Sequence, residues 1–89
     1  MEELITGARR LSPDAVSVTA LPGHVLRVRF ASGELRDFDM KPLLARTCYR
    51  PLANDILFGT ARVAFGAVQW ANGLDLDPEW LYGDSVPVE

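Results

Sequence analysis

Three acidic side chains stand at alternate positions near the C-terminal end of the chain: Asp75, Asp77 and Glu79. Carboxylate oxygens are the ligands that calcium and magnesium prefer, so this spacing could indicate a cation site. A calcium loop, however, needs more oxygen ligands and a glycine that lets the chain wrap around the ion. The Asp77-Pro78 pair instead matches a helix start, where aspartate accepts a bond from an orphan N–H and proline needs no donor. We therefore predict a turn and a helix cap, with no bound metal.

Nucleophilic catalysis has one candidate in the only cysteine of the chain, Cys48. A catalytic thiol needs an imidazole or another base beside it, and the only histidine, His24, lies far away in the sequence. We expect Cys48 to be a buried or partly buried thiol and His24 to be a solvated turn residue. The chain also lacks the glycine-rich phosphate motifs, the nucleophile elbow and the zinc-protease motif. The sequence thus predicts a protein that is not an enzyme and has no cofactor.

Anion binding is a second kind of chemistry that the residue types allow. Arg27, Arg29 and Arg36 could gather on the outer face of a sheet and contact a nucleic-acid backbone. The alternative is a solvated face on which Glu34 and Asp37 balance these arginines. The net charge of −3 argues against a general nucleic-acid binder, which usually carries a basic excess. A nucleic-acid-binding accessory domain is therefore the alternative function rather than the leading one.

The most distinctive stretch of the chain is residues 70–82, which contains both tryptophans and reads W-A-N-G-L-D-L-D-P-E-W-L-Y. A large aromatic side chain buries about 150–250 Å² of surface, so Trp70 and Trp80 are both candidates for core anchors. We expect Trp80 to pack toward the sheet near Trp70. The competing expectation is that Trp80 is an exposed hot spot for a binding partner.

The length of 89 residues and the hydrophobic content of 48% predict a single domain with a modest core. We expect the core to span residues 14–82, with loose ends at residues 1–13 and 83–89. The N-terminal end has an alternative, a short helix, because its apolar residues have helical spacing. The longest uncharged run is too short to span a membrane, and no signal peptide is recognisable. We therefore expect a cytoplasmic protein that makes no membrane contact.

Alternating apolar and polar residues predict a three-stranded antiparallel meander over residues 15–39. The residues expected to face inward from its first two strands are Val16, Val18, Ala20, Leu26, Val28 and Phe30. The third strand, residues 34–39, has an imperfect phase, because Leu35 and Phe38 cannot share one face of a regular strand. Either a bulge separates these two residues or the meander is partly covered on both faces.

Residues 40–57 change character and predict short helical turns that must pack on the sheet. Asp39 and Pro51 are expected to open these turns. Their expected contacts with the core are Leu43, Leu44, Leu52, Ile56 and Phe58. Residues 61–70 predict a C-terminal β-hairpin with a tight turn or bulge at Gly66. With the short C-terminal helix described above, these elements predict an α+β fold.

The chain also resembles a family of small bacterial proteins catalogued as domain of unknown function 2442. The matching stretches are residues 26–34, Asp39 with the leucine pair that follows it, residues 51–58 and residues 70–82. The resemblance covers roughly residues 15–82, and its most specific part is the stretch from Trp70 to Tyr82. It implies a compact α+β domain without assigned catalytic residues. It also implies relatives that are fused to a helix-turn-helix or encoded in toxin–antitoxin-like pairs.

The absence of a catalytic set in the sequence and this resemblance together predict a non-enzymatic module that binds another protein. Such a module would be the accessory or antitoxin-like half of a small bacterial protein pair. The residues that we expect to make contacts with a partner are Arg27, Arg29, Arg36 and Trp80.

Overall fold

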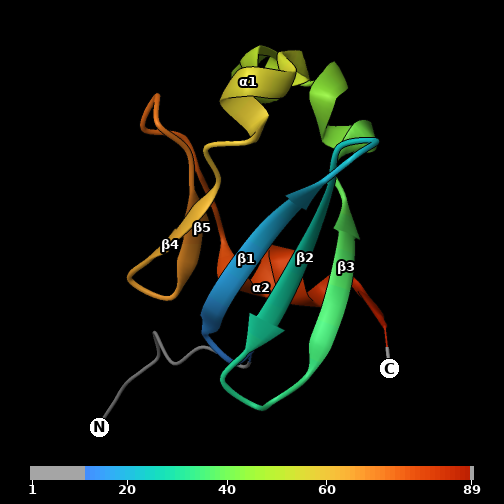
Figure 1. The fold of residues 1–89 in the computed structure, drawn as a ribbon, viewed down its shortest axis with the longest axis vertical. Coiled ribbons are helices and arrows are strands. Elements are labelled where there is room, and N and C mark those ends of the chain that lie inside the picture. The colour runs from blue at the N-terminus through green and yellow to red at the C-terminus, as the bar shows by residue number, and fades with distance from the viewer. Residues whose placement is uncertain (1–11, 89) are drawn as a thin grey trace, which may run out of the picture.

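The computed structural model describes residues 12–88 and confirms the α+β fold (Figure 1). Strands β1 (Ala15–Leu21), β2 (Val25–Phe30) and β3 (Leu35–Asp39) form the predicted antiparallel meander. They belong to a four-stranded sheet with the order β1-β2-β3-β7, and a second sheet has the order β4-β5-β6. The expectation of a loose or helical N-terminal end falls almost wholly outside the described residues.

One face of the four-stranded sheet carries the core. Along β2 every second residue is buried, so Leu26, Val28 and Phe30 face inward as predicted. Helix α2 (Pro78–Gly83) lies against this inner face, while the outer face is turned toward the viewer in Figure 1. An antiparallel sheet commonly has one packed and one solvated face, which explains the strict alternation along β2.

The start of β1 departs from the expected alternation. The pairing of β1 with β2 shifts between Ala15 and Ser17, which marks a β-bulge. Ala15 is buried, and Val16 is 58% exposed. The prediction that Val16 faces inward is therefore wrong, because one extra residue reverses the face of the residues before it.

Strand β3 contains no bulge, although its apolar residues alternate imperfectly. It pairs regularly with β2 along its length, with Arg36 opposite Val28 and Phe38 opposite Leu26. Phe38 is buried on the inner face, whereas Leu35 is half-buried on the outer face. Of the two alternatives, partial cover on both faces is the one that the structure adopts.

Three short helical turns follow β3, as predicted. They are the 3₁₀ helices η1 (Lys41–Ala45) and η2 (Thr47–Ala53) and the single α-helical turn α1 (Asp55–Phe58). The carboxylate of Asp39 accepts a hydrogen bond from the N–H of Lys41 at 2.9 Å, as expected of a residue that opens a turn. The side chains that these turns bury in the core are Leu43, Leu52 and Phe58.

Two details of these turns differ from the prediction. Pro51 lies inside η2 and opens no helix, and α1 begins after Asn54. The side chain of Asn54 accepts hydrogen bonds from the N–H groups of Ile56 and Leu57, which is the usual arrangement at a helix start. This start turns Phe58 into the core and leaves Ile56 84% exposed, so the expected core contact of Ile56 is wrong.

The predicted hairpin consists of β4 (Arg62–Ala64) and β5 (Ala67–Gln69), and β6 (Asp75–Leu76) adds a third strand beside β5. Its two central turn residues, Phe65 and Gly66, have φ angles of 54° and 78°. Positive φ at both positions gives the turn the twist that suits antiparallel strands.

Helix α2 begins as the sequence predicts. The Oδ1 atom of Asp77 accepts a hydrogen bond from the N–H of Glu79 at 2.7 Å, and Pro78 occupies the first turn. The prediction of a helix cap at Asp77 is thus confirmed.

The chain after α2 does not form the loose end that was predicted for residues 83–89. Strand β7 (Val86–Pro87) pairs with β3, and the N–H of Val88 donates to the carbonyl of Leu35 at 2.9 Å. That prediction is therefore wrong up to residue 88. A strand with one proline is suited to the edge of a sheet, because proline offers no N–H to a further strand.

Both sheets and the helical turns share one hydrophobic core. Trp70 is fully buried there, as predicted, and its indole N–H donates to the carbonyl of Phe58 at 3.2 Å. The ring of Phe58 is stacked near it, with centroids 6.4 Å apart. The other residues of this core are Ala15, Leu26, Val28, Phe30, Phe38, Met40, Leu43, Leu52, Val68, Leu76 and Leu81.

Candidate interaction surfaces

Arg27 lies on the outer face of the four-stranded sheet, as predicted. Its guanidinium donates through Nε and Nη2 to the two carboxylate oxygens of Asp37, at 2.9 and 3.0 Å. These hydrogen bonds lower the pKa of Asp37 and raise the pKa of Arg27. The carboxylate neutralises the arginine at the place where a phosphate would have to bind.

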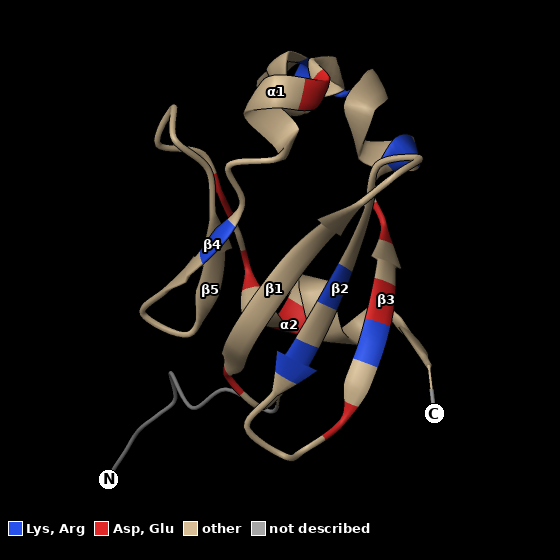
Figure 2. Cartoon of the chain, in the orientation of Figure 1, with Lys and Arg blue, Asp and Glu red and all other residues tan. Residues whose placement is uncertain are grey.

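Arg29 shares this outer face, and its Nη1 donates to the carbonyl of Gly33 at 2.9 Å. Arg36 does not share it, because Arg36 stands opposite Val28 and therefore points to the inner face. The predicted cluster of three arginines is wrong for this residue. Figure 2 marks the charged positions along β2 and β3, and the strand register decides on which face each side chain lies.

Arg36 is instead the centre of a polar network at the C-terminal end of α2. Its Nε and Nη2 donate to the hydroxyl and the carbonyl of Ser85, both at 2.7 Å. Its Nη1 donates to Glu34 at 2.9 Å, and its guanidinium lies over the ring of Tyr82, 4.5 Å from the centroid. Hydrogen bonds from Tyr82 and Arg36 hold the pKa of Glu34 below its ordinary value. The guanidinium of Arg36 thus bonds to residues of its own chain and stabilises the fold.

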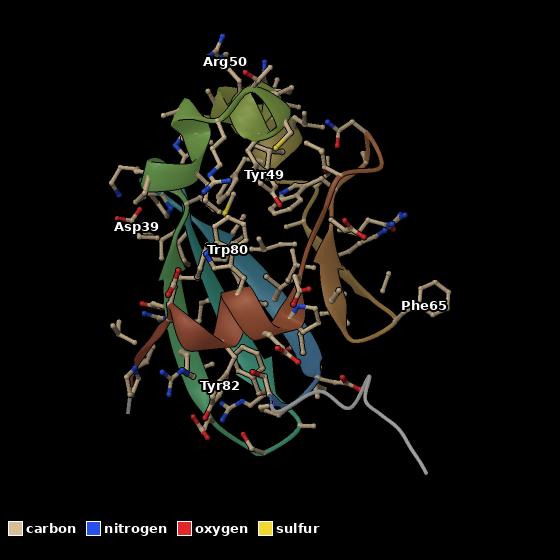
Figure 3. All side chains as sticks on the ribbon, turned by 180° about the vertical axis from the view of Figure 1, so that it is seen from behind. Asp39, Tyr49, Arg50, Phe65, Trp80 and Tyr82 are labelled. Carbon is tan, nitrogen blue, oxygen red and sulfur yellow. The ribbon has the colours of Figure 1, made fainter. Side chains whose placement is uncertain are left out.

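Trp80 is half-buried and packs against the core, as predicted, but no ring contact joins it to Trp70 among residues 12–88, so the predicted position beside Trp70 is wrong. The residue of α2 that enters the core completely is the next one, Leu81. The rings of Trp80 and Tyr49 stand nearly perpendicular to each other, with centroids 6.4 Å apart. Figure 3 labels both side chains on the side of the molecule opposite to that in Figure 1. Its indole N–H donates to Asp84 at 2.7 Å. The ring therefore lies at the rim of the core, where part of it remains accessible.

A cavity of about 330 Å³ opens beside this ring. We call it the Trp80 groove, and the residues that line it are Phe38, Asp39, Pro42, Leu43, Arg46, Trp80 and Asp84. The guanidinium of Arg46 lies over the indole of Trp80, 5.0 Å from the ring centroid. The groove therefore has an apolar floor and charged groups at its rim.

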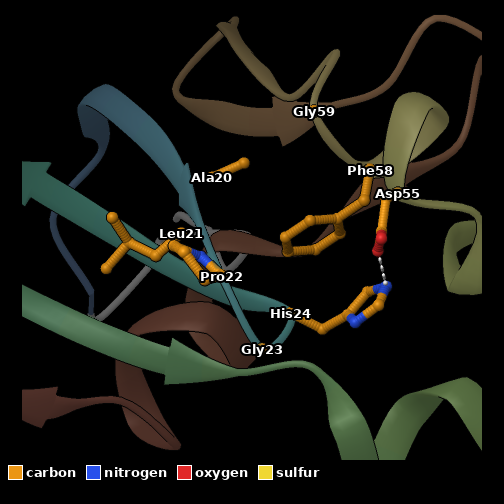
Figure 4. Close-up of a pocket in the computed structure, with 8 residues that line it drawn as sticks. All are labelled: Ala20, Leu21, Pro22, Gly23, His24, Asp55, Phe58 and Gly59. Carbon is orange, nitrogen blue, oxygen red and sulfur yellow. Dashed lines mark ion pairs between the residues drawn. The ribbon is translucent and has the colours of Figure 1, made fainter.

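His24 lies beside a second cavity, of about 360 Å³, between the β1–β2 turn and α1 (Figure 4). Its Nε2 lies 3.2 Å from the carbonyl of Ala53 and 3.3 Å from the carboxylate of Asp55, and its ring packs on Phe58. With 19% of its side chain exposed, His24 is not the solvated residue that was predicted. It fastens the β1–β2 turn to α1.

Cys48 is exposed on η2, so the prediction of a buried or partly buried thiol is wrong. The imidazole of His24 is engaged with Ala53 and Asp55, and no contact joins it to Cys48 within residues 12–88. In the same part of the chain no three side chains of histidine, cysteine, aspartate or glutamate gather as metal ligands. That the chain binds no metal stays a prediction. Asp77, one of the three acidic residues considered for such a site, serves as the cap of α2.

Phe65 is a surface feature that the sequence interpretation missed. Its side chain is 100% exposed at the tip of the β4–β5 hairpin and points away from the body of the molecule (Figure 3). Val16, which lies at the bulge of β1, is a second exposed apolar residue. The signal in the sequence is the dipeptide Phe65-Gly66, because the first central position of such a turn usually holds asparagine, aspartate or glycine.

Among the described residues, no helix is both long and apolar enough to cross a membrane. Comparison of the chain with curated proteins and with solved structures returned no match. A family model matches residues 15–87, which is most of the chain and contains both sheets and α2. The chain therefore belongs to the family described as protein of unknown function (DUF2442).

Proposed function

We propose that this chain is a non-enzymatic protein-interaction module, and that Phe65 is the side chain that anchors its partner. The single observation that carries the proposal is the complete exposure of this aromatic ring at a hairpin tip. Burial of such a side chain stabilises a complex by about 1.5–3 kcal/mol, whereas in the free molecule the ring gains nothing. Aromatic side chains are also enriched among the residues that dominate binding energy at interfaces.

The backbone of Phe65 supports the same conclusion. A residue other than glycine at a φ of 54° is strained, and such strain is found preferentially at functional sites. Asparagine or glycine would form this turn with less strain. Phenylalanine at this position therefore destabilises the turn, although its ring makes no contact with the core of its own molecule.

The hairpin holds this ring in a defined place. The N–H of Ala15 donates to the carbonyl of Gly66 at 2.9 Å, which ties the tip to the first strand of the other sheet. The side chain of Asp14 packs so closely on Gly66 that a Cβ atom there would lie 2.6 Å from its Cγ. A rigid tip loses little conformational freedom on binding, which increases the affinity that one anchor can supply.

The partner that best fits this tip is a different protein with a concave apolar pocket. The ring of Phe65 and the exposed part of Val16 together cover far less than the roughly 800 Å² per partner that a standard interface buries. Two copies that met tip to tip would therefore gain too little contact. A pocket that surrounds the ring gains more, and contacts around its rim would provide the remaining area.

A pull-down with a matched control tests this proposal. The parent protein, Phe65→Ser and Ile56→Ser are used as baits in an extract of the source organism, and bound proteins are quantified by mass spectrometry. Ile56 is a suitable control because it is 84% exposed on α1, outside the hairpin. We expect a partner that the parent and Ile56→Ser retain, and that Phe65→Ser loses at least about tenfold.

Two outcomes would contradict the proposal. A partner that all three baits retain equally would show that Phe65 is not the anchor. If light scattering shows a concentration-dependent dimer of the parent that Phe65→Ser does not form, the partner of Phe65 is a second copy of this chain and not a different protein. The melting of each variant is measured alongside, so that a loss of binding is not confused with unfolding.

The alternative role in nucleic-acid binding receives less support from the geometry. Arg36 points to the inner face, and Asp37 neutralises Arg27. The antitoxin-like role likewise stays a prediction. A gel shift at low and high salt addresses the first of these, since binding through phosphate contacts weakens steeply with salt.

A further inference from the structure

The indole of Trp80 positions one positive and one negative group at the rim of the Trp80 groove. Arg46 lies over the face of the ring, 5.0 Å from its centroid, and Asp84 accepts the indole N–H at 2.7 Å. Both residues line the cavity of about 330 Å³. A single aromatic ring thus places a guanidinium and a carboxylate around the same space.

These charged groups keep bonding capacity that the described residues do not use. Between residues 12 and 88, the guanidinium of Arg46 stacks on the indole and forms no ion pair or hydrogen bond. Toward the described residues, Asp84 uses only Oδ2, for the indole N–H, which leaves Oδ1 open. Within residues 12–88, Asp39 uses only Oδ1, for the backbone N–H and the ammonium of Lys41, which leaves Oδ2 open. A ligand in the groove could therefore reach both an unpaired cation and open carboxylate oxygens.

The floor of the groove is apolar. Phe38 is 2% exposed and Leu43 is 6% exposed, and Pro42 completes the wall on the side of η1. An apolar lining with a few converging polar groups is the usual composition of a small-molecule site. The volume lies near the lower end of the range of about 300–1,000 Å³ that is typical of such sites, which restricts the ligand to a small molecule.

We propose that the Trp80 groove binds a small zwitterion with an apolar side chain, of the class of the apolar α-amino acids. The carboxylates of Asp39 and Asp84 would repel a ligand with only a negative charge, and Arg46 would repel a ligand with only a positive charge. A zwitterion satisfies both, with its carboxylate on the guanidinium and its ammonium on the open carboxylate oxygens. Its side chain rests on the apolar floor. This site does not depend on the partner of Phe65.

Titration of the full chain with L-leucine, followed by the backbone and indole N–H signals in NMR spectra, tests the site. N-acetyl-L-leucine, which lacks the ammonium, and L-leucinamide, which lacks the carboxylate, are the two comparison ligands. We expect saturable shifts of the Trp80 indole N–H with leucine, and affinities at least about tenfold weaker for each comparison ligand. The indole signal is a direct reporter because this N–H is bound to Asp84.

Two substitutions separate the roles of the charges. Arg46→Gln should weaken the binding of leucine about tenfold but should not weaken the binding of leucinamide, because leucinamide has no carboxylate for the guanidinium and loses a like charge beside it. Asp84→Asn keeps an acceptor for the indole N–H, and it should weaken the binding of leucine but not that of N-acetyl-leucine, which has no ammonium and loses a like charge beside it. Arg50→Gln, at an exposed arginine of η2 outside the groove, is the control and should behave like the parent.

The absence of any saturable shift with leucine up to about 50 mM would overturn the proposal. It would equally be overturned if a comparison ligand bound as tightly as leucine, since the site would then recognise only one charge. Equal affinities of Arg46→Gln and Arg50→Gln for leucine would remove Arg46 from the site. None of these outcomes bears on Phe65, so the interaction proposal can stand or fall separately.

Discussion

The hydroxyl of Tyr82 lies 2.9 and 2.8 Å from the two carboxylate oxygens of Glu34, so one donor is shared by both ends of the carboxylate. The two residues are 48 positions apart in the sequence. This contact completes the polar network of Arg36 and Ser85 and joins α2 to Glu34, the residue directly before β3. It connects the stretch of residues 70–82 to the meander that precedes it.

This contact predicts a dependence of stability on acid. The pKa of Glu34 in the folded chain lies below its ordinary value of 4.5, chiefly because Tyr82 donates to the carboxylate. A lowered folded pKa contributes stability that is present above 4.5 and is lost as the pH falls through the lower folded value. We expect Tyr82→Phe to reduce the free energy of unfolding at neutral pH and to flatten its decrease on acidification. Urea denaturation from about pH 7 to pH 3 measures both effects.

Equal acid dependence of the parent and Tyr82→Phe would refute this role of the contact. The comparison is needed because the pKa values of Asp37 and Asp39 are also lowered and add a dependence of the same sign. Those two carboxylates are unchanged in Tyr82→Phe, so the difference between the two proteins isolates Glu34.

A second prediction concerns two neighbours on α2. Leu81 is fully buried, so Leu81→Ala should cost about 2–5 kcal/mol of unfolding free energy, the range for large apolar residues deleted from cores. Trp80 is half-buried at the groove, so Trp80→Ala should cost less than Leu81→Ala although it removes the larger side chain. Urea denaturation of both variants decides the order. A larger cost for Trp80→Ala would mean that the ring contributes to the core more than its exposure suggests.

The cap of α2 gives a third prediction with a close control. Asp77→Ala removes the acceptor of the Glu79 N–H and should cost about 0.5–2 kcal/mol. Asp75→Ala, two residues earlier, removes a carboxylate of the same charge that forms no hydrogen bond or ion pair with the described residues. We expect Asp75→Ala to change stability by less than Asp77→Ala in the same thermal melts. Equal effects would attribute the loss to charge rather than to the cap.

The turn at Phe65 gives a fourth prediction, in which stability rises. Asparagine tolerates a φ of 54° better than phenylalanine and is preferred at this turn position, so Phe65→Asn should stabilise the free molecule. The same change removes the proposed anchor and should abolish partner binding. Thermal melts and the pull-down test the two halves separately. A lower melting temperature for Phe65→Asn would mean that the ring stabilises its own molecule.

Several features of this protein follow from the sequence alone because their causes are local. The alternation that buries Leu26, Val28 and Phe30 needs only the two-residue period of a strand. The cap at Asp77 needs only an aspartate followed by proline and glutamate. The hairpin turn needs only the glycine at position 66 between two short apolar runs. Each of these signals lies within a few neighbouring residues.

Other features were decided only by the tertiary structure. The face of Arg36 depends on the register of β3 against β2, because the phase of the third strand is ambiguous on its own. Strand β7 depends on a partner about 50 residues away in the chain, so its two residues carry no pattern of their own. The exposure of Phe65 depends on which residues occupy the centre of the turn, since a shift by one position reverses every side chain. Pairing between distant segments fixed these positions, and no local pattern encodes such pairing.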